Sequence, residues 1–298
     1  MPGATWSEDL QLFVRPYADA WQMGLVSLLV WGAIHLIASK VVCPMFDVTY
    51  GASMKDSDVI KGKKVKADSW YTSHANFEAS VKITALVHAL VSSSGSLFAI
   101  LSAKHLIMST DTLYDQDALQ RLILGISCGY FLYDFIIALS SFDIPFLIHG
   151  GMSSIIYLHA YGQSFCLQLG CFFLLYEFST IFLNIRAIMI ASGNGKHKFF
   201  PLIEKLFFGT FMFFRMVLGL GYSIFVTIPV LTSLVLSGKS HSDIATILFI
   251  VANIAINGLN VMWSKAMIDI LLGRGKRDSK PAATISTTSQ PPQDKKAD

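Results

Sequence analysis

Charged residues are scarce in this sequence. They make up 14% of its 298 residues, whereas hydrophobic residues make up 53% and the mean hydropathy is +0.54. A soluble domain carries about a quarter charged residues, so this composition argues against a water-soluble globular fold. Nine prolines and the lack of alternating apolar residues argue against a membrane β-barrel. The class that remains is an all-α polytopic membrane protein.

Cysteine is also rare, and the four cysteines lie in or beside apolar stretches without a CxxC pair. We therefore expect neither a metal site nor a disulfide framework. The sequence has no GxxxxGK[ST] loop, no HExxH helix and no GxSxG elbow, and we predict no cofactor. The basic stretch 61–66 suits anionic head groups better than nucleic acid. The N-terminal segment lacks the basic region of a cleaved signal peptide, so the first helix is expected to be retained.

Seven apolar stretches are long enough to cross a membrane, because about 20 helical residues span a hydrocarbon layer of ~30 Å. The third and fourth are separated only by residues 141–143, which predicts a tight helical hairpin. The fourth is the shortest and the least apolar. Pro229 is expected to kink or end the long sixth stretch. The predicted spans are 20–38, 80–102, 122–140, 144–160, 165–190, 206–236 and 244–272.

Lysine and arginine are distributed unevenly around these spans. Seventeen lie after the first and fifth spans or at and beyond the end of the seventh, whereas four lie on the other side. Cytoplasmic loops carry the excess of these residues. The N-terminus is therefore predicted to be outside or luminal and the C-terminus cytosolic, as an odd number of spans requires.

Composition divides the chain into three parts. Residues 1–69 hold the first span and a basic cytosolic loop, residues 70–273 hold the other spans, and residues 274–298 form a polar tail expected to be disordered. Lys295 and Lys296 resemble the dilysine retrieval signal of endoplasmic reticulum proteins. This pattern predicts residence in the endoplasmic reticulum membrane, with coat proteins as partners. The alternative is a solvated charge pair.

Ionisable and amide side chains occur inside the apolar spans. A charge in the bilayer interior is costly, so such groups face a cavity or pair with one another. On five helices polar residues repeat at a spacing of three or four, which places them on one face of each helix. The topology places them mainly in the cytosolic half of the membrane. We therefore predict a shared central cavity, lined by His88, Asp134, His149, Ser153, Tyr157, Glu177, Asn184, Arg215, Asn257 and Asn260.

Structural roles are the alternative for part of this set. Polar side chains also join membrane helices, at about 0.6–2 kcal/mol per hydrogen bond. The asparagine stripe of the last span favours that role, His88 fits either, and Gly129 predicts close helix packing. His159 is expected near the membrane interface. Asp134 and Arg215 are charged and deep, which favours a cavity over a purely structural ion pair.

Several motifs, taken in order, resemble the TLC-domain family, which includes the TRAM proteins and the Lag-type ceramide synthases. His88 follows Trp70 in a serine-rich span, and residues 129–134 read Gly-Tyr-Phe-Leu-Tyr-Asp. Residues 177–186 resemble the family block Glu-x-Ser-Thr followed by Phe-Leu-Asn-x-Arg, and the last two spans carry Arg215 and Trp263. The resemblance covers about residues 70–272 and implies a multipass helical fold.

One departure separates this sequence from the ceramide-synthase-like members. Those members have adjacent histidines where His149 is followed here by Gly150 and Gly151. The acidic pair that they carry further along is not evident after Arg186. The sequence therefore resembles the members of the family that are not ceramide synthases.

Three functions follow as expectations. The first is a protein that binds a membrane lipid or acyl chain in the cavity and affects lipid composition, with Arg215 and His88 meeting a polar or anionic head group. The second is an acyl-CoA-dependent N-acyltransferase with His149 as catalytic base. The third is an adaptor for the sorting or translocation of other proteins.

Overall fold

The computed structural model describes residues 6–45, 69–103, 109–110, 112–192 and 194–272. Within these ranges every regular element is a helix, so the all-α prediction is confirmed. The centre of the predicted basic loop, the polar tail and the dilysine pair at Lys295 and Lys296 lie outside the described residues.

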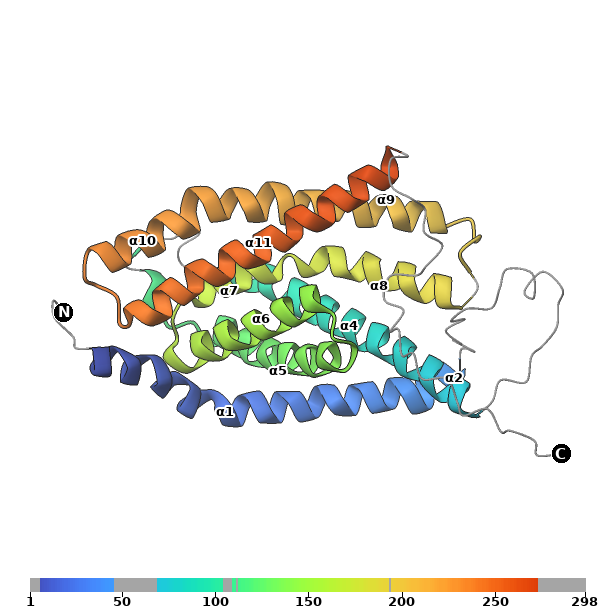
Figure 1. Cartoon of the computed structure of the whole chain (residues 1–298), viewed down its shortest axis with the longest axis horizontal. Coiled ribbons are helices and arrows are strands. Elements are labelled where there is room, and N and C mark those ends of the chain that lie inside the picture. Colours follow the sequence, from blue (N-terminus) through green and yellow to red (C-terminus); the bar gives the residue numbers. More distant parts are fainter. Residues whose placement is uncertain (1–5, 46–68, 104–108, 111, 193, 273–298) are drawn as a thin grey trace, which may run out of the picture.

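The helices pack side by side as a bundle, and successive passes run in alternating directions (Figure 1). We call the end of the bundle at which α1 begins the proximal end, and the end at which α11 finishes the distal end. A short 3₁₀ helix, η2 (Thr112–Tyr114), lies between the second and third passes. In chain order the passes are α1 (Trp6–Ile37) extended by η1 (Ala38–Val42) and α2 (Cys43–Met45); α4 (Ser69–Leu101); α5 (Ala118–Ser141); α6 (Ile144–Gln163); α7 (Leu167–Leu174) with α8 (Glu177–Ala191); α9 (Phe200–Phe211) through η3 (Met212–Leu220) and η4 (Ser223–Thr227) to α10 (Ile228–Leu236); and α11 (Asp243–Leu271).

Length and composition make most of these passes able to cross a membrane. Six qualify among the described residues: Trp6–Val42, Phe77–Leu101, Ala118–Ser141, Leu167–Ala191, Phe200–Leu236 and Asp243–Leu271. The remaining pass, α6, has 20 residues and is less apolar, and it packs against α1, α5 and α11. Because α6 is covered by other helices, it carries histidine and serine without presenting all of them to lipid. Six to seven apolar helices define a polytopic membrane protein.

The α5–α6 connection has the tight geometry that the sequence predicts. Phe142 ends α5 in the left-handed region at a φ of 50°, and Asp143 directly precedes α6. Proline follows in the first turn, where its missing N–H costs nothing. Gly150 lets α6 approach α5 closely, since a Cβ there would lie 3.0 Å from the backbone of Phe135. The predicted helical hairpin is confirmed.

A glycine also brings α1 against α5. A Cβ at Gly129 would overlap the Ser27 side chain, so the close packing predicted for this position is confirmed. At the same contact, Ser27 Oγ and Trp31 Nε1 donate to the carbonyl oxygen of Ile126 at 2.7 and 2.9 Å. These two hydrogen bonds join the first pass to the interior of the bundle.

The pass from α9 to α10 contains two π-helical segments, η3 and η4. Such segments are rare and occur often at functional sites, and Arg215 lies in η3. Pro229 lies in the first turn of α10, where π-helical geometry gives way to α-helical geometry. The helix continues without a break from η4 through Pro229 into α10, so Pro229 does not end the pass, although it removes one backbone donor from it.

Candidate functional site

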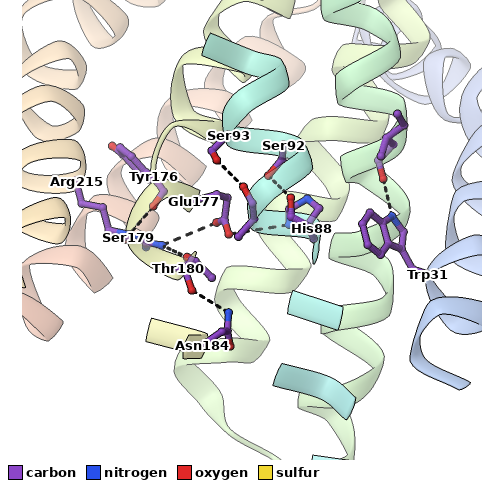
Figure 2. A network of polar contacts seen from close by, with 12 residues as sticks. Trp31, His88, Ser92, Ser93, Tyr176, Glu177, Ser179, Thr180, Asn184 and Arg215 are labelled. Carbon is purple, nitrogen blue, oxygen red and sulfur yellow. Dashed lines mark hydrogen bonds and ion pairs between the residues drawn. The ribbon is translucent and has the colours of Figure 1, made fainter. Parts of the chain in front are cut away.

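The buried Arg215 side chain joins η3 to α8 and α11 (Figure 2). Its Nε donates to Ser179 Oγ at 2.9 Å, and its Nη2 donates to Thr180 Oγ1 at 3.0 Å. Its Nη1 donates to Asn260 Oδ1 at 3.0 Å. The guanidinium also lies over the Tyr176 ring, with 5.5 Å between its carbon and the ring centre. Each guanidinium nitrogen therefore donates to one protein oxygen, which uses three of the five N–H groups.

Glu177 lies between Arg215 and His88 (Figure 2). Its Oε1 is 3.9 Å from Arg215 Nη2, and its Oε2 is 4.0 Å from His88 Nδ1. Both distances are longer than a hydrogen bond, so the carboxylate is balanced in charge and keeps capacity to accept hydrogen bonds. Removing one partner of a buried ion pair strands the other charge in a medium that solvates it poorly.

His88 is held by aromatic packing. Its ring stacks on Tyr130 with 3.6 Å between centres and 6° between planes. The rings of Trp31 and Phe131 meet it edge-on at 5.4 and 5.5 Å. Neither ring nitrogen has a hydrogen-bond partner in the part of the chain that the structure describes. His88 thus joins α1, α4 and α5, with Glu177 as its polar neighbour.

Tyr176 connects this network to α11. Its hydroxyl donates to Asn257 Oδ1 at 3.0 Å, and Asn257 Nδ2 donates to Ser223 Oγ at 2.9 Å and to the Asn253 carbonyl oxygen at 2.9 Å. Gly219 provides the space for this arrangement, because a Cβ there would overlap the Tyr176 ring. The sequence of η3 therefore fixes where the Tyr176 ring lies.

A partly open cavity of about 90 Å³ lies beside the network. Its lining includes polar residues such as His149, Glu177 and Asn257 and apolar ones such as Ala160 and Phe249. Along α6, which runs from the distal to the proximal end, His149 precedes Ala160, and along α11, which runs the opposite way, Phe249 precedes Asn257 (Figure 1). The cavity is bounded by Leu124 and Phe131 of α5; His149, Met152, Ser153, Ile156, Tyr157 and Ala160 of α6; Cys166, Leu169, Gly170, Phe173, Leu174, Tyr176 and Glu177 from α7 to α8; Thr227 of η4; and Phe249, Ala252, Asn253, Ile256 and Asn257 of α11.

The residues predicted to line one cavity are divided between its wall and its surroundings. The wall includes His149, Ser153, Tyr157, Glu177 and Asn257. The network next to it holds His88, Arg215 and Asn260, which the cavity-lining residues do not include. Asn184 donates to the Thr180 carbonyl oxygen at 2.9 Å, and Asp134 interacts electrostatically with Lys82 on α4. Arg215 is thus held by protein groups, whereas Asp134 has Glu177 as its first electrostatic neighbour and Lys82 as its second.

His149 lies on the wall without a catalytic partner. Its ring meets Phe131 edge-on at 5.9 Å and Trp263 at 6.5 Å. Its Nδ1 has no hydrogen-bond partner among the described residues, and neither Asp134 nor Ser153 is bonded to the ring there. A general base acts on a group within about 2.6–3.2 Å. The base–nucleophile pair expected for an acyltransferase is not formed among these side chains.

Five hydrogen-bonded residues of the network were absent from the predicted set: Tyr176, Ser179, Thr180, Ser223 and Asn253. Tyr176 directly precedes α8, where it belongs to no helical stripe, and Ser179 falls two positions from Glu177. In η3 and η4 the spacing from Gly219 fits both Tyr222, three positions on, and Ser223, four positions on. In the structure Tyr222 stacks on Phe172 with 3.8 Å between ring centres. The hydroxyl of Ser223, one residue after Tyr222, was the feature of the sequence that could have identified it.

A second polar cluster lies at the proximal end. His159 is completely buried among protein groups, four residues before the end of α6. His159 Nε2 lies 3.1 Å from His241 Nε2, and His241 Nδ1 lies 3.1 Å from the Tyr114 hydroxyl. The His241 backbone N–H donates to the same hydroxyl at 3.0 Å. Asp9 accepts from the first N–H groups of α11 at 3.0 and 3.2 Å, so this cluster fastens the start of α11 to α1, α6 and η2.

A bundle of six to seven long apolar helices is a multipass membrane protein. Its matched region identifies the family: residues 78–269 match the TLC domain, and the chain belongs to the TLC-domain family. It is similar to TLC domain-containing protein 4 C of Dictyostelium discoideum, with 29% identity over 189 residues, 61% of this chain and 68% of that protein. An uncharacterized TLC domain-containing protein of Schizosaccharomyces pombe is 25% identical over 185 residues, 59% of this chain and 61% of its own length. Neither relative is named as a ceramide synthase, in agreement with the departure at His149.

Proposed function

We propose that this protein holds one apolar chain of a membrane lipid in the cavity between α5, α6, α7 and α11, and through this affects membrane lipid composition. The observation that carries the proposal is a cavity with apolar walls and one polar end, enclosed by membrane-spanning helices. Pockets that combine apolar lining with a few placed polar groups are the usual form of a small-molecule site.

The size of the cavity limits what enters it. At about 90 Å³ it is smaller than an engineered cavity of about 150 Å³ that accepts benzene. It therefore suits a stretch of one chain, and its open side lets the remainder of the molecule extend outward. Two chains side by side do not fit.

Mass spectrometry of lipids that co-purify with the protein tests the proposal. Ala252→Phe adds a ring inside the cavity, whereas Val251→Phe adds the same ring at the neighbouring exposed position of α11. We expect Ala252→Phe to lose the bound lipid and Val251→Phe to retain it. Equal lipid in both variants would contradict the proposal.

The compartment and the topology belong to the same proposal. The uneven distribution of lysine and arginine supports a luminal N-terminus and a cytosolic C-terminus, and the pair at Lys295 and Lys296 supports residence in the endoplasmic reticulum membrane. The alternating passes of the bundle agree with termini on opposite sides.

The position of His149 supports a second candidate, acyl transfer from acyl-CoA. The ring lies on the cavity wall, and its Nδ1 has no hydrogen-bond partner in the described chain. A group so placed is free to accept a proton from a bound substrate. Labelled acyl-CoA offered with a panel of amine acceptors should give a product that His149→Ala abolishes if this candidate is correct.

A further inference from the structure

The polar groups around the cavity also bear on the head group of its ligand, an inference that rests on the proposed function. Arg215 is the nearest cation to Glu177, yet its three nitrogens donate to Ser179, Thr180 and Asn260. Neither lysine nor arginine occurs among the described residues that line the cavity. A phosphate or carboxylate head group would therefore enter without a cation to meet it.

The wall offers hydrogen-bond acceptors instead. Glu177 lines the cavity, and its contacts with Arg215 and His88, at 3.9 and 4.0 Å, leave acceptor capacity unused. Asn257 lies across from it with both amide functions engaged, by Tyr176 on the oxygen and by Ser223 and Asn253 on the nitrogen. His149 and Thr227 also line the cavity, and their Nδ1 and Oγ1 atoms have no hydrogen-bond partner among the described residues. Of the described acceptors on the wall, the Glu177 carboxylate is the one with a formal negative charge, which makes the strongest hydrogen bond with a proton donor.

Charge balance decides between a cationic and an uncharged donor. The formal charges of Arg215 and Glu177 cancel, and the two side chains are 6% exposed each. An added ammonium would leave one positive charge uncompensated in a medium of low dielectric constant, and an added carboxylate would leave one negative charge. An uncharged hydroxyl leaves the balance unchanged and still donates to a charged acceptor, which makes a stronger hydrogen bond than a neutral one.

We infer that the cavity binds one chain of an uncharged, hydroxyl-bearing lipid, with the hydroxyl donating to Glu177 and the chain running toward Phe249 and Ala160 at the proximal side. Arg215 is a positioning residue in this arrangement. It holds Glu177 ionised and aimed at the cavity, and it does not touch the ligand.

Four probes with the same ten-carbon chain test the inference: 1-decanol, decanoate, decylamine and decane. Each is added at equal mole fraction to nanodiscs containing the full chain, and displacement of tritiated decanol is measured at pH 8. We expect decanol to displace the label at least tenfold more effectively than the other three. The inference would be overturned if decanoate, decylamine or decane displaced the label as effectively as decanol.

Two substitutions each remove one charge of the Arg215–Glu177 pair and provide a second test of the head-group inference. Glu177→Gln leaves Arg215 uncompensated, so decanoate should gain on decanol. Arg215→Gln leaves Glu177 uncompensated, so decylamine should gain. Thermal unfolding of each variant shows whether it folds, and if neither folds, the comparison of the four probes on the unaltered protein decides alone.

The same assay distinguishes a failure of the head-group inference from a failure of the proposed lipid-binding function. If tritiated decanol binds to neither the unaltered protein nor Val251→Phe, and both carry no lipid after purification, the proposed lipid site itself is refuted. If lipid co-purifies but a charged probe displaces best, the site stands and the head-group inference is refuted.

Discussion

The contact between Tyr176 and Gly219 shows how a single missing side chain shapes the site. The Tyr176 ring occupies the space that a Cβ at Gly219 would need, and from there it covers Arg215 and reaches Asn257. The position of Tyr176 therefore depends on three other residues at once: Gly219, Arg215 and Asn257. The glycine is the one of them that carries no polar group.

Substituting Gly219 should therefore disturb both stability and binding. Gly219→Ala forces the Tyr176 ring from its place, and overpacking of this kind costs about 1–3 kcal/mol. Gly209→Ala is the matched control, since a Cβ there meets nothing within 4 Å. We expect a lower midpoint of thermal unfolding and less bound lipid for Gly219→Ala alone. A midpoint equal to that of Gly209→Ala would show that the ring moves without cost.

Arg215 and Glu177 should be coupled energetically. Arg215→Met leaves a buried carboxylate without its cation and is expected to destabilise the protein by about 3–5 kcal/mol. In the double variant with Glu177→Met, no charge is stranded, so part of that loss should be recovered. Thermal unfolding of the two single variants and the double variant measures the coupling. Additive losses would mean that the 3.9 Å contact contributes no pairwise energy.

At the scale of elements, the helices that obey α-helical periodicity were predictable and those that depart from it were not. The α5–α6 hairpin follows from the short Ser-Phe-Asp connection between two apolar runs and from the proline in the first turn after Asp143. The face of η3 and η4 does not follow in the same way, because counting from Gly219 reaches Tyr222 in three positions and Ser223 in four, and the sequence does not show which of them joins the network. No local sequence pattern indicates the change from α-helical to π-helical geometry.

The predicted depth of Asp134 in the membrane did not show which residues lie near it. The sequence showed that it is charged and buried in an apolar run, which favoured the cavity. The structure gives it Lys82 as an electrostatic neighbour, on another helix and 52 positions away in number. Pairing between distant residues depends on how helices are rotated against each other, which composition and spacing leave open.

The contact between the start of α11 and the end of α6 should respond to pH. Burial lowers the pKa of His241 from its ordinary value of 6.5 to about 4, although the nearby Asp9 opposes that shift. The folded protein therefore keeps His241 neutral where the unfolded chain takes up a proton, so stability should fall as pH drops from about 6.5 toward 4.

Thermal unfolding at pH 7.5, 6 and 5 measures this effect, and we expect the midpoint to fall by several degrees. His241→Gln removes the titrating ring while keeping an amide near Tyr114 and His159, so its midpoint should depend less on pH. The same dependence in both proteins would assign the effect to other groups.

At the scale of the whole molecule, the number and direction of the passes were the most predictable features. Apolar length, the short 141–143 connection and the uneven lysine and arginine count each constrain the same arrangement. Their agreement explains why the membrane fold could be predicted although the cavity wall could not.

The predicted address is testable in cells. Lys295→Ser combined with Lys296→Ser removes both lysines from the tail, so the tagged protein should leave the endoplasmic reticulum for later compartments. Lys276→Ser is a control that removes a basic residue from the same tail and keeps the pair. Fluorescence microscopy with compartment markers measures the outcome, and an unchanged distribution of the double variant would refute the retrieval signal.

The family match begins at residue 78, yet α1 packs against α5 and α6 through Gly129 and places Trp31 against His88. A fragment that starts at α4 would contain every matched residue but would lack α1, which covers one side of α5 and α6. The α6 helix, with its two histidines, would then face acyl chains that cannot solvate it. We conclude that the smallest piece of this chain able to assemble in a bilayer includes a segment that family comparison leaves out.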